Sequence, residues 1–175
     1  MSKNKRLAVN IILVCNAIII SYLESFIPIP IPVPGIKLGL ANIIILIAIE
    51  FLDLKDALFI MTVKCLIIAL LTKGVVVLAF SLSGGILSVL GMWFVYHHFS
   101  RFFSIKGVSI IGALLHNTGQ IGAAFLILKS SIIFYYLPVL LISALITGFI
   151  TGTIGSAVIR EISIKGILHD QNENR

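Results

Sequence analysis

Charged side chains are scarce in this chain, at 11% of its 175 residues, whereas hydrophobic residues reach 59%. Soluble domains typically contain about 25% charged and about 45–50% apolar residues. These charges are too few to coat a water-facing globule of this size, and the apolar residues fall in long blocks. The composition therefore predicts an integral membrane protein surrounded by a lipid bilayer.

Cysteine is almost absent as well. The two cysteines, Cys15 and Cys65, lie inside apolar blocks and form no Cys-x-x-Cys or Cys/His cluster. Their placement implies neither a disulfide nor a metal site. His116 has no second histidine or carboxylate at ligand spacing, so no metal is predicted there either.

Acidic residues number only 7, against 13 lysines and arginines. Asp53 and Asp56 lie close together in a turn that we interpret as solvated, and the sequence has no carboxylate cluster of the kind that holds magnesium on a diphosphate. It also lacks a G-x-x-x-x-G-K-[ST] phosphate loop. We therefore expect a protein that is not an enzyme and has no cofactor.

Basic runs are short in spite of the net charge of +6, and none extends beyond residues 3–6. Without aromatic residues interleaved among basic ones, no nucleic-acid partner is predicted. We interpret the excess charge as a topology signal, because cytoplasmic loops of membrane proteins are enriched in lysine and arginine.

The chain does contain about six apolar blocks, close to the roughly 20 residues that a helix needs to cross a bilayer core. The first block is too long for a signal-peptide core and lacks a small-x-small cleavage site, so it is expected to be retained. Alternating prolines at 28–34 forbid a helix and predict a stiff extended loop. The blocks cover about 7–27, 36–52, 57–72, 75–96, 108–128 and 133–159.

The distribution of cations predicts the orientation. With the N-terminus in the cytoplasm, the inner segments carry nine cations and the outer segments three, as the positive-inside rule requires. The sequence thus predicts an all-α integral membrane bundle of about six transmembrane helices in the cell membrane, with both termini cytoplasmic. Residues 1–160 are expected to form one transmembrane domain, and residues 161–175 a polar cytoplasmic tail.

Lys64 is the residue that fits lipid least. It lies nine residues from Lys73 at the predicted outer boundary, hence roughly 13 Å deep at 1.5 Å per residue. Its ammonium therefore needs a partner or a wet cavity. Glu24 lies at a depth that Lys64 can reach. Two interpretations stay open: an internal Lys64–Glu24 ion pair, or a Lys64 that faces a cavity and meets an anionic ligand.

His116, Asn117 and Gln120 give the fifth block a polar centre. Gly112, His116 and Gln120 recur at every fourth position and so share one helix face, which has to face protein or water. That face either forms interhelical hydrogen bonds, typically worth about 0.6 kcal/mol each, or lines a ligand site. Both interpretations stay open.

The second block opens with Lys37, Gly39 and Asn42. The free N–H groups and positive dipole end of a helix, reinforced by Lys37, suit an anion. Alternatively, the glycines of this segment allow close packing and Lys37 anchors the helix at the interface.

Three segments together resemble one family: residues 34–42 (Pro-Gly-Ile-Lys-Leu-Gly-Leu-Ala-Asn), residues 81–85 (Ser-Leu-Ser-Gly-Gly) and residues 112–120 (Gly-Ala-Leu-Leu-His-Asn-Thr-Gly-Gln). Up to about residue 160 the chain is similar to the Gx transporter family, often labelled heptaprenyl diphosphate synthase component I. The family's motif positions correspond here to Lys37, Gly39, Asn42, Ser83, Gly84, His116, Asn117 and Gln120.

The resemblance implies a relation to the S components of energy-coupling factor (ECF) vitamin transporters. Those are six-helix bundles with cytoplasmic termini that bind a small molecule near the outer face. They depend on a coupling membrane protein and on ATPase subunits, which become the implied partners here. Many S components carry an Ala-xxx-Ala contact motif in the first helix. Here the residue four positions after Ala8 is Ile12, so the motif is not formed.

The leading hypothesis is a substrate-binding membrane subunit for uptake of a small molecule, such as an anionic or amphipathic isoprenoid or quinone precursor. Its pocket is expected in the outer half, with residues 28–34 as a lid. The alternatives are a non-catalytic membrane subunit linked to heptaprenyl diphosphate or menaquinone synthesis, and a scaffold of a redox assembly. The predicted site comprises Glu24, Lys37, Gly39, Asn42, Lys64, Ser83, Gly84, His116, Asn117 and Gln120.

Overall fold

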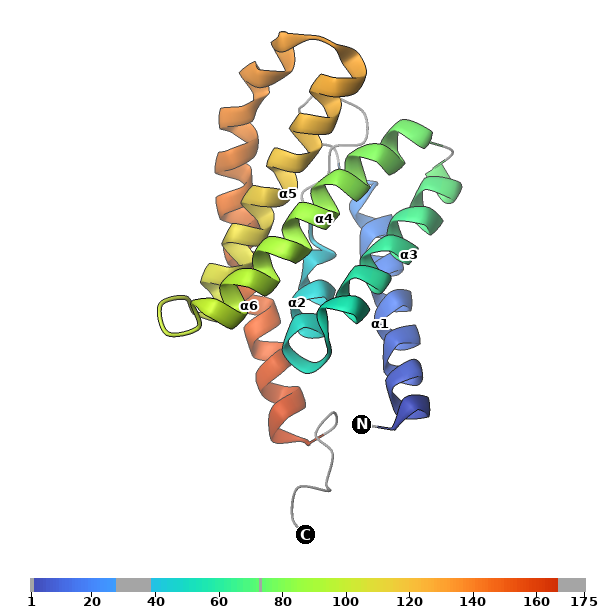
Figure 1. Ribbon diagram of the computed structural model, residues 1–175, viewed down its shortest axis with the longest axis vertical. Coiled ribbons are helices and arrows are strands. Elements are labelled where there is room, and N and C mark those ends of the chain that lie inside the picture. Colours follow the sequence, from blue (N-terminus) through green and yellow to red (C-terminus); the bar gives the residue numbers. More distant parts are fainter. Residues whose placement is uncertain (1, 28–38, 73, 167–175) are drawn as a thin grey trace.

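The computed structural model of the chain describes residues 2–27, 39–72 and 74–166 (Figure 1). Every regular element in these segments is helical, as predicted. In chain order they are α1 (Lys3–Glu24), α2 (Asn42–Phe51), α3 (Leu54–Thr72), α4 (Val75–His98), α5 (Ile105–Leu128), the 3-10 helix η1 (Ser131–Tyr136) and α6 (Leu137–Ile164).

Local sequence sets several of these helix boundaries. The Ser2 and Ser104 side chains accept hydrogen bonds from the N–H groups of Lys5 and Gly107, both at 3.4 Å, and so cap α1 and α5. Such N-caps satisfy backbone donors that a helix leaves unpaired. Both helices therefore begin before the apolar blocks that identified them. Pro138 lies in the first turn of α6, where its missing N–H costs nothing.

The second helix differs most from its predicted range of 36–52. Gly39 has a φ of +85°, and residues 40 and 41 form a turn, so α2 begins only at Asn42. Its ten residues span about 15 Å, roughly half of a bilayer core. Residues 36–38 lie outside the described segments.

Four helical segments are long and apolar enough to cross a membrane: α1, α4, α5 and the continuous stretch Ser131–Ile164. α2 is too short for this criterion, and α3 carries Lys55, Asp56 and Lys64 within its 19 residues. The structure therefore shows an all-α bundle with four helical segments able to span a membrane. Six complete crossings stay a prediction.

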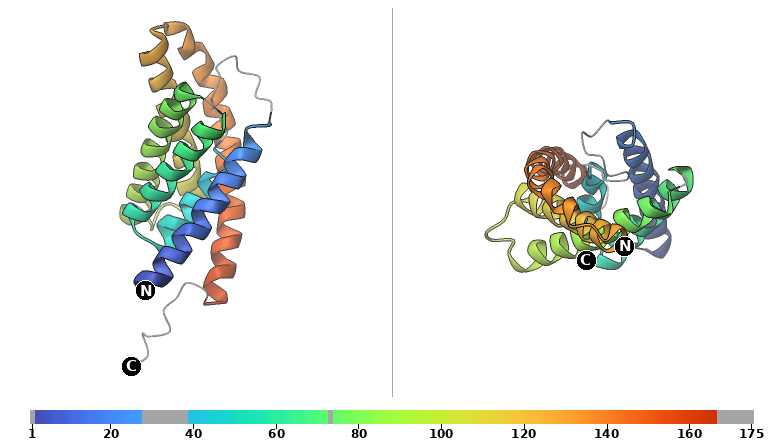
Figure 2. Two further views of the ribbon diagram at one scale, coloured as in Figure 1. Left: turned by 90° about the vertical axis from the view of Figure 1, so that its right-hand side faces the viewer. Right: turned by 90° about the horizontal axis from the view of Figure 1, so that it is seen from above.

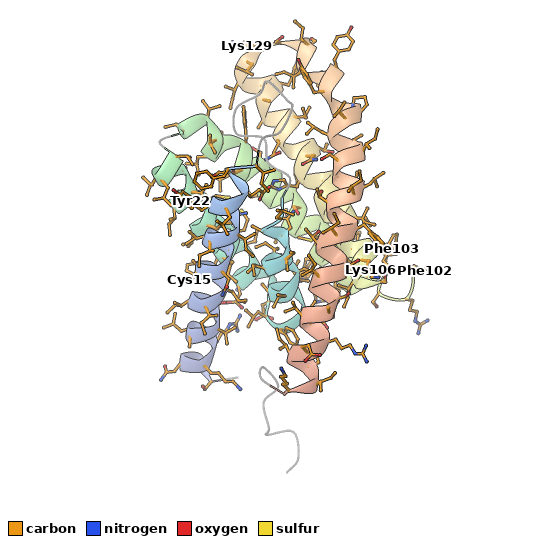
Figure 3. All side chains as sticks on the ribbon, turned by 180° about the vertical axis from the view of Figure 1, so that it is seen from behind. Cys15, Tyr22, Phe102, Phe103, Lys106 and Lys129 are labelled. Atoms are coloured by element: carbon orange, nitrogen blue, oxygen red, sulfur yellow. The ribbon has the colours of Figure 1, made fainter. Side chains whose placement is uncertain are left out.

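The helices form one bundle around α2 (Figures 1 and 2). α1 begins and α6 ends at the same end of the bundle, here named the terminal end. The short α2 packs against α1, α3, α4, α5 and α6, whereas α1 and α6 do not pack against each other over the described residues. Apolar and aromatic side chains project from the outer faces (Figure 3), as expected where lipid is the solvent.

The turn between α2 and α3 is only partly solvated: the Asp53 side chain is 70% exposed, as interpreted from the sequence, whereas the Asp56 side chain is 10% exposed. The Arg6 guanidinium contacts both Asp53 Oδ2, at 2.6 Å, and Asp56 Oδ2. Asn10 Nδ2 donates to Asp56 Oδ1 at 2.7 Å. We name Arg6, Asn10, Asp53 and Asp56 the polar clamp, because they fasten the start of α1 to the start of α3.

Small residues bring α5 and α6 together. A Cβ added at Gly148 would lie 2.7 Å from the Cα of Ile110, and one at Gly152 would lie 2.8 Å from the Cα of Lys106. The glycines therefore allow the two backbones to approach closely. The hydroxyls of Ser109 and Thr151 share a hydrogen bond of 2.8 Å in the same interface.

Candidate functional site

Gly39, shortly before α2, lies where three helices come together. Gly39 N–H donates a 2.5 Å hydrogen bond to Glu24 Oε1, which joins the end of α1 to the start of α2. A Cβ added at Gly39 would lie 3.0 Å from Asn42 Nδ2 and 3.6 Å from His116 Cδ2. Gly39 therefore contacts Glu24 through its backbone and lies beside Asn42 and His116, and all four residues are buried.

Gly84 provides the second surface of this site. A Cβ added there would lie 2.6 Å from the carbonyl oxygen of His116 and 2.9 Å from Gln120 Cγ. In return, a Cβ at Gly119 would lie 2.7 Å from the carbonyl oxygen of Ser83. These glycines let α4 touch α5 where His116 and Gln120 point inward. Ser83 takes part through its backbone.

Asn117 points elsewhere. Its Nδ2 donates a 2.8 Å hydrogen bond to the carbonyl oxygen of Leu140, at the start of α6. The side chain therefore connects α5 to α6. This is the interhelical hydrogen bonding that was one of the two interpretations of the polar centre. The polar centre of α5 thus divides into one face with His116 and Gln120, toward α4 and α2, and one with Asn117, toward α6.

Several buried polar atoms lack a hydrogen-bond partner among the described residues. Gln120 is 0% exposed, and neither its Nε2 nor its Oε1 is paired; Asn42 Nδ2 and Asn117 Oδ1 are unpaired as well. Leaving a buried donor or acceptor unpaired costs about 1–3 kcal/mol. Such a group is expected to meet water or a guest molecule.

Ser88 joins this set and was not part of the predicted site. It lies one helical turn beyond Gly84 on α4, is fully buried, and its Oγ has no hydrogen-bond partner among the described residues. Its spacing of four residues from Gly84, which places both on one helix face, is the sequence signal that could have found it.

Lys64 is buried, with 6% of its surface exposed, on the face of α3 that packs against the bundle. Within the described part of the chain it makes no ion pair with Glu24 and no hydrogen bond. The structure therefore brings Lys64 into the bundle interior without the internal ion pair that was one of its two interpretations.

Helix geometry gives the distance of three site residues from the helix ends that lie nearer the terminal end. Asn42 opens the ten-residue α2, Lys64 follows ten residues after the start of α3, and His116 follows eleven after the start of α5. At 1.5 Å per residue, each of the three lies about 14–17 Å along its own helix from the end of α2 or from the start of α3 or α5. Lys37 and the predicted lid at 28–34 lie outside the described residues.

No group of three or more histidine, cysteine or acidic side chains within the described segments is arranged to hold a metal ion. The uncharged amides, the imidazole and the hydroxyl of this interior provide hydrogen-bond donors and acceptors instead. The arrangement suits recognition of a polar group by hydrogen bonds.

The apolar spanning helices and the polar interior define a membrane protein with a buried polar site. The model of the family described as heptaprenyl diphosphate synthase component I matches residues 13–158, and the chain belongs to this family. This confirms the family resemblance that the sequence motifs indicated. The searches of curated proteins and of solved structures found no match.

Proposed function

We propose that this protein is a substrate-binding membrane subunit, similar to an ECF S component, that takes part in the uptake of a small molecule. The observation that supports this most is the convergence of Asn42, His116 and Gln120 beside Gly39 and Gly84. Buried atoms of Asn42 and Gln120 have no hydrogen-bond partner among the described residues. A site of this kind is ready to bind a polar group, because its donors and acceptors are already desolvated.

Lys64 supports an anionic or amphipathic substrate. A buried ammonium is costly unless a counter-ion compensates it, and the described residues supply none. The aliphatic side chains that fill the rest of the interior would receive an apolar body. An isoprenoid or quinone precursor with an acidic group combines both features.

Uptake by this protein would require partners that move the bundle and supply energy, namely a coupling membrane protein and ATPase subunits. In this proposal the protein lies in the cytoplasmic membrane with both termini in the cytoplasm. The residues that we propose as substrate-binding are Glu24, Lys37, Gly39, Asn42, Lys64, Ser83, Gly84, His116, Asn117 and Gln120.

Native mass spectrometry of the gently purified protein tests the site. We expect a retained small molecule in the wild type and its loss in Gln120→Leu, which removes both amide atoms while keeping the size of the side chain. Thr118→Val is the matched control, because Thr118 is exposed on the same helix and bonds only its own helix, at the Leu114 carbonyl oxygen. Equal retention in all three proteins would contradict the proposed site.

A second candidate function follows from the description of the family. A protein of the heptaprenyl diphosphate synthase component I family could act as a non-catalytic membrane subunit in heptaprenyl diphosphate or menaquinone synthesis, or as a scaffold of a related redox assembly. Copurification separates the two candidates. An ATPase pair with a coupling membrane protein supports uptake, whereas a soluble prenyltransferase supports the synthase role.

A further inference from the structure

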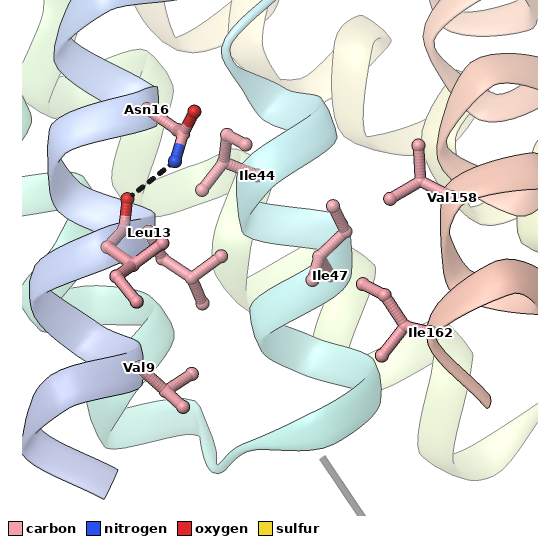
Figure 4. A pocket seen from close by; sticks show the side chains of 8 residues that line it. Val9, Leu13, Asn16, Ile44, Ile47, Val158 and Ile162 are labelled. Carbon is pink, nitrogen blue, oxygen red and sulfur yellow. Dashed lines mark hydrogen bonds between the residues drawn. The ribbon is translucent and has the colours of Figure 1, made fainter. Parts of the chain in front are cut away.

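A groove lies between α1 and α6, away from the polar site (Figure 4). Its volume is about 380 Å³. The bottom is formed by Ile44 and Ile47 of α2, and the walls are almost entirely aliphatic. The lining residues are Val9, Ile12, Leu13, Asn16, Ile44, Ile47, Val158 and Ile162.

The groove follows from the architecture. α2 packs against both α1 and α6, but α1 and α6 do not pack against each other over the described residues. A channel is therefore left along α2, open on its outer side. Asn16 is the polar residue of the lining, and its Nδ2 donates to the carbonyl oxygen of Ile12 in its own helix.

Toward the terminal end the groove adjoins a charged hollow. A second depression of about 350 Å³ shares Val158 and Ile162 with the groove and reaches Glu161 and Lys165. Lys165 Nζ lies 3.6 Å from Glu161 Oε2, but both side chains are 64% exposed. An ion pair exposed to this degree contributes little free energy, so it does not hold the Lys165 ammonium firmly.

The opposite wall also ends in a cation. Lys5 precedes Val9 by four residues in α1, so both lie on one helix face, with Lys5 nearer the terminal end. An apolar channel thus runs from the middle of the bundle to a rim with Lys5 on one side and Lys165 on the other. This combination matches one apolar chain with an anionic headgroup.

We propose that the groove is a binding site for an anionic phospholipid of the leaflet at the terminal end. One acyl chain lies along Ile44 and Ile47, and the phosphate lies between Lys5 and Lys165. Each lysine near a membrane surface favours an anionic headgroup by about fivefold. The site therefore prefers phosphatidylglycerol to zwitterionic phosphatidylcholine, which a merely annular lipid contact would not do.

The experiment uses the purified full chain in detergent with equimolar phosphatidylglycerol and phosphatidylcholine, and native mass spectrometry to count retained lipids. We expect at least about fivefold preference for phosphatidylglycerol in the wild type. Ile12→Trp fills the groove and should abolish retention. Ile19→Trp is the control, because Ile19 lies on the same helix with 57% exposure against 59% for Ile12, but outside the groove.

The headgroup contact is tested separately. The double variant Lys5→Gln and Lys165→Gln should lose the preference while still retaining a lipid chain, and Lys129→Gln near the opposite end should behave as the wild type. Equal retention of the two lipids, or no effect of Ile12→Trp, would overturn the proposal. Stronger retention of an added polyprenyl diphosphate, or a copurified partner helix that displaces phosphatidylglycerol, would reassign the groove to that occupant.

Discussion

At the scale of single residues, the main question is what compensates the charge of the buried Lys64. The sequence alone identified it as a cation too deep for lipid, because its distance from Lys73 follows from counting residues. It did not decide between an ion pair with Glu24 and a ligand, because that depends on side-chain directions across helices. In the described structure the Glu24 carboxylate accepts the Gly39 N–H, and Lys64 makes no ion pair with it.

We therefore predict that Lys64→Met stabilises the ligand-free protein. The substitution nearly keeps the length of the side chain but removes a buried charge, and burying a charge without a counter-ion costs free energy. The measurement is thermal unfolding in detergent after exhaustive dialysis. The same variant should lose binding of an anionic ligand.

Lys165→Met provides the comparison for this prediction. Lys165 is exposed, so its replacement should change the free energy of unfolding by less than about 0.5 kcal/mol. A fall in stability for Lys64→Met would show that Lys64 has a structural partner and would remove it from the site.

At the scale of helices, the sequence predicted the elements better than their ends. The apolar blocks identified all six α-helices because each continuous apolar run is long. The start of α2 was wrong because the positive φ of Gly39 interrupts a run that looks continuous in hydropathy. The role of Asp53 and Asp56 was missed for a related reason: their partners Arg6 and Asn10 lie more than 40 residues away.

The polar clamp leads to a prediction about two neighbouring acids. Asp56 receives hydrogen bonds from Arg6 and Asn10 with a side chain only 10% exposed, whereas the Asp53 side chain is 70% exposed. Asp56→Ala leaves the buried Asn10 amide without its acceptor and should lower the free energy of unfolding by about 1–3 kcal/mol. Asp53→Ala removes an exposed contact and should cost less than about 1 kcal/mol.

Chemical denaturation or thermal unfolding of both variants in the same detergent measures the difference. If the two alanine variants were equally stable, the clamp would not depend on burial of Asp56. The start of α1 would then be held to α3 by apolar packing alone.

At the scale of the whole molecule, most of the motif positions identified in the sequence lie close together in the structure. Motif positions separated by up to 81 residues, from Gly39 to Gln120, meet inside one bundle because α2 is central and short. Sequence reasoning identified these residues from their polarity and from the family resemblance. It could not predict that Asn117 turns toward α6. Successive side chains on a helix point about 100° apart, and the sequence does not tell which helix packs against each face.

The orientation of the bundle gives a prediction for the intact membrane. The polar clamp holds the turn between α2 and α3 beside the start of α1, so these lie on one side. Because α5 is long and apolar enough to cross a membrane, the connection between α5 and η1 is expected on the opposite side. Because cations concentrate on the side of the termini, that side is expected to face the cytoplasm.

Cysteine labelling measures this orientation in a background with Cys15→Ala and Cys65→Ala. Arg101→Cys lies between α4 and α5, and Ser131→Cys lies at the start of η1; both positions are exposed. A membrane-impermeant maleimide added to intact cells should label Ser131→Cys at once and Arg101→Cys only after lysis. The reverse pattern would place the termini outside, so that Lys5 and Lys165 would face the outer leaflet. Labelling of both positions in intact cells would mean that α5 does not cross, and the polar site would then not lie in the membrane interior.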